Sequence, residues 1–288
     1  MTILLLGATG QLGREWQDFL KSGDHPAVQL VTFSSDQLDI TRTRALAEEL
    51  RGRRPDVVVN CAAYTDVDGA EEDRDTARRV NTAAAGDLAE LSAELGFSLI
   101  HYSTDYVFPG SEEDRGHYPG GYPEDHPADP VNFYGRTKWE GEQAIRKAAG
   151  RYLILRVSWL CGVYGSNFVK TMLRLGRERD QLQVVNDQWG SPSFATEVVR
   201  HSWALLKAGE TGTFHSTSGG LITWYDLANA VFDKKNIDVA VKAVSSDAFP
   251  AVADRPRFSK LNTEKLEAVP GCSVQGWETG LDRMLERL

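Results

Sequence analysis

A tyrosine and a lysine four residues apart are the side chains of this 288-residue sequence best suited to acid chemistry. On a helix, Tyr134 and Lys138 share one face. A nearby ammonium favours the phenolate, so we expect Lys138 to lower the tyrosine pKa from about 10 toward neutrality, where a general acid works efficiently. Ser103, Thr104 and Asp105 lie upstream, and the Thr104 hydroxyl can bond a substrate carbonyl or the tyrosine oxygen. The pattern predicts catalysis by Thr104, Tyr134 and Lys138, although Ser-Thr-Asp can also simply hold a turn.

A glycine-rich turn near the N-terminus predicts a dinucleotide site. It follows an apolar strand (2–6) and opens a helical pattern (11–21), which is the context that a phosphate-binding turn requires. The backbone can approach a pyrophosphate there, and the helix N-terminus supplies partial positive charge. The residues expected at this cradle are Gly7, Gly10, Gln11, Leu12 and Gly13.

The ends of the next two strands bear on the choice of cofactor. The second strand ends in Ser34 and Ser35, without the carboxylate that normally grips the ribose of NAD and without an arginine. We therefore expect NADPH to be preferred, with NADH also used. Asp39 and Ile40 are placed to contact adenine and ribose, but Asp39 can equally cap a helix. After the following strand, the small and polar residues expected beside the cofactor are Ala62, Ala63, Tyr64 and Thr65.

Strands alternating with helices predict an α/β fold, a Rossmann-type doubly wound parallel sheet with a smaller C-terminal substrate lobe. Residues 1–155 are expected to form the dinucleotide-binding domain and 156–288 mainly the substrate lobe, with some later segments returning to the sheet. Residues 109–130 read as a loop, either a lid or a solvated excursion. Strands are expected at 2–6, 28–33, 55–60, 97–102, 152–158 and 182–185, and helices at 11–21, 41–50 (capped by Thr41), 74–95, from about 134, 168–179, 195–207, 223–232 and 277–287.

The composition and charge of the chain limit the kinds of protein that it can be. Hydrophobic residues make up 41% and charged residues 25% of the chain, which is ordinary for a globular protein. A net charge of -9 argues against broad nucleic-acid binding. We find no secretory signal or membrane span and expect a cytoplasmic protein. Cys61, Cys161 and Cys272 lack metal or redox spacing and are expected to be core thiols.

These segments together resemble the extended short-chain dehydrogenase/reductase family, and within it the dTDP-4-dehydrorhamnose reductases. The motifs that carry the resemblance are GATGQLG at 7–13, AAYTDVD at 62–68, STDYVF at 103–108, YGRTK at 134–138, RVSW at 156–159, NFVKTM at 167–172, NDQWGSP at 186–192 and RPR at 255–257. Related dehydratases carry Thr-Asp-Glu where this chain has Tyr106 as the third residue. Loss of that glutamate favours ketone reduction over elimination.

The resemblance implies reduction of the C4 ketone of dTDP-4-dehydro-β-L-rhamnose by NAD(P)H, the last step of dTDP-L-rhamnose synthesis. The nucleotide-sugar contacts that it implies are Thr104, Asp105, Tyr134 and Trp159, and the cofactor contacts include Tyr102, Tyr134 and Lys138 beside the residues given above. Trp159 can instead be a core residue. Two other readings stay open: a reductase or epimerase of another keto-sugar, and a dinucleotide-binding regulatory subunit without turnover.

Two further sites are weighed from the same resemblance. Arg255 and Arg257 suit the substrate diphosphate, because guanidinium groups bind phosphate oxygens in pairs, but surface salt bridges are an equal alternative. Some family members hold Mg²⁺ between subunits through a glutamate of the first helix. Glu15 fits that position, but residues 190–197 do not clearly supply the other carboxylates. No metal is therefore expected, Glu15 is a weak candidate, and a homodimer stays possible.

Overall fold

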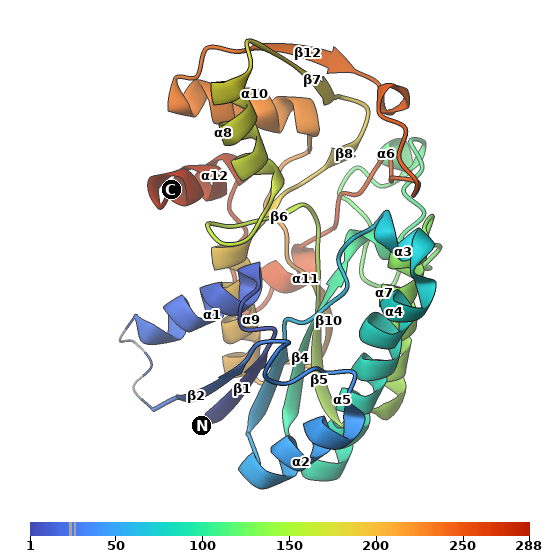
Figure 1. Cartoon of the computed structure of the whole chain (residues 1–288), viewed down its shortest axis with the longest axis vertical. Helices are drawn as coiled ribbons and strands as arrows, with labels where there is room; N and C mark the ends of the chain where they lie inside the picture. The colour runs from blue at the N-terminus through green and yellow to red at the C-terminus, as the bar shows by residue number, and fades with distance from the viewer. Residues whose placement is uncertain (23–24, 26) are drawn as a thin grey trace.

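The computed structural model describes residues 1–22, 25 and 27–288, and its centre is a six-stranded parallel sheet (Figure 1). The order across the sheet is β10-β5-β4-β3-β1-β2, so the direction of winding reverses between β1 and β3. This is the expected doubly wound fold, and the prediction of its class is confirmed. The strands are β1 (Thr2–Leu6), β2 (Gln29–Phe33), β3 (Val57–Asn60), β4 (Ser98–Thr104), β5 (Arg151–Val157) and β10 (Gly212–His215).

Helices cover both faces of the sheet (Figure 1). On one face, α1 (Gln11–Lys21) and α9 (Ala195–Ala208) pack together over a core that includes Trp16 and Phe214. On the other face, α2 (Thr43–Arg53) and α5 (Ala84–Leu95) bury Leu46 and Leu88 against the strands. The helix α7 (Phe133–Ala148) packs beside α5. Because both faces are covered, the central strands read as continuous apolar runs.

Two local predictions are wrong for identifiable reasons. Thr41 does not cap α2: the Asp39 carboxylate accepts hydrogen bonds from the Thr41 N–H and hydroxyl, at 2.9 and 2.8 Å, and this turn delays the helix start to Thr43. The strand expected to end at Tyr102 continues to Thr104, because Ser103 and Thr104 still pair with β5. Thr104 is thus held in the sheet, and Asp105 is the first residue of the 3-10 turn that follows (Asp105–Val107).

The remaining elements surround the carboxyl edge of the sheet. In the first half, α3 (Gly69–Glu72), α4 (Arg74–Arg78) and a π-turn (Arg79–Ala83) precede α5. Beyond β5, the chain builds an upper lobe with a core of its own around Val169, Leu227 and Leu281 (Figure 1). Its elements are β6 (Leu160–Cys161), α8 (Phe168–Glu178), β7 (Gln181–Val185), β8 (Trp189–Gly190), β9 (Ser193–Phe194), β11 (Ile222–Thr223), α10 (Trp224–Lys235), β12 (Ala240–Val244) and α12 (Trp277–Glu286). The short helix α11 (Glu264–Glu267) instead packs against β10 and buries Leu266 in the core of the sheet.

The segment 109–130 is packed rather than solvated at its centre. It contains the short helix α6 (Asp114–His117), and Tyr122 is fully buried in a cluster with Phe108 and Phe258. The Tyr122 N–H also bonds the Lys260 carbonyl at 2.9 Å. A solvated excursion is therefore wrong for this part of the loop.

None of the helices in the described part of the chain is both long and apolar enough to cross a membrane. Cys161 and Cys272 are buried free thiols, as expected, whereas Cys61 is only partly buried.

Candidate active site

A cavity of about 650 Å³ opens at the carboxyl ends of the parallel strands, where the winding of the sheet reverses. This is the place at which doubly wound proteins bind ligands. The cavity brings together most of the residues that the sequence singled out, from both halves of the chain. Those that line it are Gly10, Gln11, Leu12, Ala63, Thr65, Tyr102, Thr104, Asp105, Tyr134, Lys138 and Trp159.

The glycine-rich turn has the geometry of a pyrophosphate cradle. Gly7 has φ +72°, and a Cβ there would lie 2.7 Å from the Ala62 nitrogen. A Cβ on Gly13 would lie 2.3 Å from the Gly7 carbonyl oxygen. The N-cap residue of α1, Gly10, has no side chain to cap the helix, so its first N–H groups remain available to an anion. Gly7 and Gly13 therefore shape the turn, and Gly10, Gln11 and Leu12 face the cavity.

A second hollow, of about 570 Å³, lies at the tip of β2. No arginine follows Ser34 closely in the sequence, but the fold brings Arg14 and Lys21 there from α1. Arg14 lies over the Tyr164 ring at 5.5 Å. Sequence reasoning missed this cationic rim because it searched only the residues after β2. The helical position of Arg14, one residue past the glycine turn, was the available signal.

Thr104, Asp105 and Tyr134 form the polar centre of the cavity. The Thr104 hydroxyl donates to the Asp105 carboxyl at 3.0 Å, and the aromatic rings of Tyr134 and Tyr106 meet edge to face at 5.7 Å. Burial raises the pKa of Asp105 to about 7, against the neighbouring Thr104 and Ser259 hydroxyls. Burial also raises the pKa of Tyr134 to about 12; the Thr104 hydroxyl opposes this rise, and Asp105 adds to it.

Lys138 is 2% exposed and does not lower the tyrosine pKa in this structure. Its Nζ donates to the Tyr102 carbonyl at 2.6 Å and lies 3.3 Å from His101 Nε2. The side chain thus points toward β4, a direction that helical spacing could not reveal. Burial lowers the pKa of Lys138 to about 8, partly offset by the Glu142 carboxylate. The prediction of a lowered tyrosine pKa is wrong for the chain without ligand.

Aromatic side chains wall the cavity on the side of the upper lobe. Trp159 adopts a left-handed backbone conformation with φ 47° and stacks on Trp224, with ring centroids 3.7 Å apart. Phe168 packs against Trp224 at 4.6 Å. The sequence pointed to Trp159, whereas Phe168 and Trp224 were expected only as residues of the helices 168–179 and 223–232. Their position as the first residues of α8 and α10 directs both toward the cavity.

Some predicted cofactor contacts lie outside this cavity. Ile40 is a core residue, Asp39 holds the turn before α2, and Ala62 and Tyr64 are partly buried against core clusters and do not line the cavity. Tyr102 lines the cavity but directs its hydroxyl away from the catalytic cluster. That hydroxyl bonds Trp16 at 2.7 Å and Ser202 at 2.8 Å, between α1 and α9.

The two arginines proposed for a diphosphate differ in their surroundings. Arg255 bonds the Asp68 carboxylate at 2.8 Å and lines a neighbouring hollow of about 290 Å³. Phe168 and Trp224 form the wall between this hollow and the main cavity. Arg257 instead pairs with Asp187 and Asp247, so it is a salt-bridge residue.

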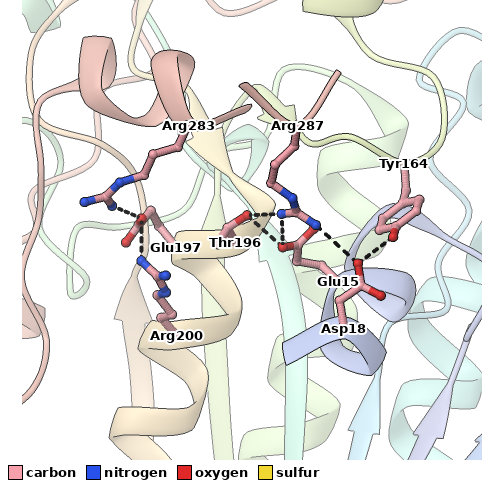
Figure 2. A network of polar contacts seen from close by, with 8 residues as sticks. All are labelled: Glu15, Asp18, Tyr164, Thr196, Glu197, Arg200, Arg283 and Arg287. Atoms are coloured by element: carbon pink, nitrogen blue, oxygen red, sulfur yellow. Dashed lines mark hydrogen bonds and ion pairs between the residues drawn. The ribbon is translucent and has the colours of Figure 1, made fainter. Parts of the chain in front are cut away.

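Glu15 belongs to a network of charged side chains that links the first helix to the C-terminal turn (Figure 2). Its carboxylate pairs with Arg287 at 2.5 Å and accepts a bond from Thr196 at 2.7 Å. Arg287 also bonds Asp18, which accepts a bond from Tyr164. The described residues contain no group of three or more His, Cys, Asp or Glu able to hold a metal. The Arg287 guanidinium therefore already neutralises the Glu15 carboxylate, which was the candidate metal ligand. The site does not fit Mg²⁺.

The parallel sheet, the glycine turn and the Thr, Tyr and Lys cluster define the class of extended short-chain dehydrogenases/reductases. Within that class, the family model described as RmlD substrate binding domain matches residues 1–288, and the chain belongs to this family. The resemblance drawn from the sequence is thereby confirmed.

Relatives match over nearly their whole length. The dTDP-4-dehydrorhamnose reductase of Escherichia coli strain K12 is 40% identical over 303 residues, covering 100% of this chain and 98% of the relative. A solved reductase of the same name from Clostridium acetobutylicum superimposes with a TM-score of 0.94 at 36% identity, covering 100% of this chain and 99% of that one. The structure from Bacillus anthracis, in complex with NADP, gives 0.93 at 36% identity with the same coverage.

Proposed function

We propose that this chain reduces the C4 ketone of dTDP-4-dehydro-β-L-rhamnose with NADPH or NADH to give dTDP-L-rhamnose. The observation that carries the proposal is the meeting of Thr104, Tyr134 and Lys138 in one cavity that opens onto the glycine turn of α1. Relatives named for this activity, 35% to 40% identical, support the choice of substrate.

The chain's own residues fit a dinucleotide. The glycine turn and the free N–H groups of α1 suit its pyrophosphate, and Arg14 with Lys21 at the tip of β2 favours the additional phosphate of NADPH. The NADP complex of the Bacillus anthracis relative agrees with this preference. When bound, the cofactor supplies the hydride.

In our proposal, Tyr134 is the proton donor to the sugar oxygen. Thr104, fixed at the end of β4, bonds the same oxygen and aligns it. Lys138 would hold the nicotinamide ribose of a bound cofactor. Because its Nζ lies in the buried cavity wall, it is placed to return a proton toward Tyr134. The stacked Trp159 and Trp224 give the sugar a flat apolar wall that excludes water.

The neighbouring hollow suits the nucleotide end of the substrate. It shares Phe168 and Trp224 with the main cavity, so one extended ligand can occupy both. Arg255 lies at this hollow and can exchange its Asp68 partner for diphosphate oxygens. Phe249, 48% exposed on the same rim, offers an apolar surface to the base.

The test follows NADPH absorbance with enzymatically generated dTDP-4-dehydrorhamnose. We expect oxidation by the native chain and a loss of roughly 10²- to 10⁴-fold in turnover for Tyr134→Phe, because a positioned general acid contributes that much. NADPH affinity, measured by fluorescence, should be retained. Tyr152→Phe is the matched control, since Tyr152 lies in β5 outside the cavity lining.

Two results would count against the proposal. Full turnover in Tyr134→Phe would remove the tyrosine from its role. Tight NADPH binding with no oxidation would favour another keto-sugar or a regulatory subunit. Arg255→Met separates the substrate contact from the chemistry: we expect a raised KM for the sugar nucleotide and an unchanged KM for NADPH.

A further inference from the structure

A buried row of polar side chains lies directly behind Lys138. Asn60 ends β3, His101 lies in the middle of β4, and Lys138 comes from α7. Their exposed fractions are 1%, 2% and 2%. The distances along the row are 3.1 Å from Asn60 Nδ2 to His101 Nδ1 and 3.3 Å from His101 Nε2 to Lys138 Nζ.

The hydrogen bonds of Asn60 determine which atoms of this row donate and which accept. The Ala62 N–H donates to the Asn60 amide oxygen at 3.1 Å, so the amide nitrogen faces His101. An amide nitrogen only donates, and His101 Nδ1 must therefore accept. Burial, reinforced by the nearby Lys138, lowers the pKa of His101 well below its usual value, so the ring is neutral. A neutral ring that accepts at Nδ1 carries its proton on Nε2.

The Nε2–H group of His101 thus points at the nitrogen of Lys138. An ammonium cannot accept this hydrogen bond, whereas a neutral amine can. The Tyr102 carbonyl, at 2.6 Å, is the acceptor that remains for the lysine. The contact with His101 therefore favours loss of the lysine proton, in the same direction as burial.

Other ionisable groups around Lys138 do not cancel this contact. On α7 and the elements packed against it next to Lys138, they are Tyr134, Glu142, Asp105, Tyr106, Arg156, His101 and Tyr102, with the Cys61 thiol across the cavity. The Glu142 carboxylate favours the ammonium, but it is already paired with Arg156 and Arg146 at 2.8 and 2.7 Å. No ionisable side chain of α3, α4, α5 or the π-turn is buried in the described structure.

We propose that His101 is a positioning residue of the reductase: Asn60 fixes its tautomer, and its Nε2–H group makes Lys138 a stronger acid than it would be if only acceptors faced it. The proposal rests on the function given above. After Tyr134 gives its proton to the sugar oxygen, the tyrosinate must regain one. A lysine that releases its proton readily supplies it and is reprotonated from solvent, so atoms and charges balance over the cycle.

The first test needs no substrate, and a variant serves only to assign the signal. Long-range ¹⁵N–¹H correlation spectra of the native chain report which ring nitrogen of each histidine is protonated. We expect the His101 signal, assigned by its loss in His101→Gln, to be that of a neutral Nε2–H ring from pH 6 to 9. A neutral Nδ1–H ring or an imidazolium would overturn the proposal, whatever sugar the protein reduces.

The second test uses the pH profile of turnover. In His101→Gln, the amide can turn its oxygen toward the ammonium, so we expect the alkaline limb assigned to Lys138, near pH 8, to move up by about one pH unit. His201→Gln removes a different buried histidine, bonded to Ser216 and Ser273, and should leave the limb in place. If His101→Gln folds and its alkaline limb stays at the native pH, the proposal that His101 makes Lys138 more acidic is overturned.

Discussion

At the scale of single residues, Asp105 and Tyr134 influence each other's protonation. The Asp105 carboxyl is 3% exposed, and burial raises its pKa to about 7. When Asp105 is ionised, its charge raises the pKa of Tyr134 and makes the tyrosine a weaker acid. The protonated form of Asp105 is therefore the one that favours proton donation.

We expect turnover to fall as pH rises through about 7, because Asp105 loses its proton there. The neutral fraction of such a group decreases about tenfold between pH 6 and pH 8. Asp105→Asn keeps an acceptor for the Thr104 hydroxyl without the charge, so its profile should lack the fall near pH 7 and keep only the Lys138 limb near pH 8. The measurement is kcat/KM for the sugar nucleotide from pH 5.5 to 8.5. The same fall near pH 7 in the native protein and in Asp105→Asn would contradict the role given to the Asp105 charge.

The sequence pointed to Thr104, Tyr134 and Lys138 because their types and spacing are informative without a structure. It did not predict the direction of the Lys138 side chain. A helical spacing of four gives a shared face, but the Tyr102 carbonyl and His101, which orient Nζ, come from β4. Roles in catalysis stay predictions until the variants are measured.

At the scale of elements, α1 has three separate tasks. Its N-terminus faces the cavity, Arg14 reaches the hollow at the tip of β2, and Glu15 joins the network with Arg287. The bounds of α1 were predictable because Leu12 and Trp16 mark its buried face and the glycine turn marks its start. The proximity of Arg14 to Ser34 could not be predicted from the sequence, because it depends on how α1 packs on the sheet.

Arg14→Ala tests the contribution of α1 to cofactor choice. We expect the Kd for NADPH to rise about tenfold, the value of one lost charge-assisted contact to a phosphate, and the Kd for NADH to stay unchanged. Arg44→Ala removes an equal charge from the exposed face of α2 and serves as the control. A parallel rise for both cofactors would show that Arg14 acts on the turn and not on the additional phosphate.

At the scale of the whole molecule, a buried ion pair holds the sheet, α7 and the loop 109–130 together. Arg156 of β5 is 1% exposed and bonds Glu142 of α7 through two nitrogens, at 2.9 and 2.8 Å. It also donates to the Glu124 carbonyl at 3.0 Å. Burial raises the pKa of Glu142, but Arg156 and Arg146 outweigh it and hold the pKa below its usual value.

Glu142→Gln removes the carboxylate that neutralises the buried Arg156 charge, and we expect it to lower the free energy of unfolding by about 3–5 kcal/mol. Because the folded-state pKa of Glu142 is lowered, its contribution is present above pH 4.5 and is lost as pH falls below that value. The difference in the free energy of unfolding between native and variant proteins, measured with urea, should therefore become smaller in acid. Glu178→Gln, in an exposed pair with Arg174, should change little at either pH.

The overall fold was predictable from alternating strand and helix patterns, but one strand of the central sheet was not. Residues 212–215 gave no strand signal, because β10 is short and lies between an amphipathic helix and a loop. Its pairing with β5, like the packing of α9 on the face of the sheet, shows that the chain returns to the sheet after building part of the upper lobe. The division at residue 155 stays a prediction.

This return has a consequence for the protein during its synthesis. Strands β1 to β5 are complete once residue 157 has left the ribosome, but β10, which covers the edge of β5, is made only at residues 212–215. In the interval, β5 has a free row of backbone donors and acceptors, which is a template for pairing with other chains. The nascent polypeptide is thus most prone to aggregate between these two points, and ribosomes stalled there should yield the least soluble chains.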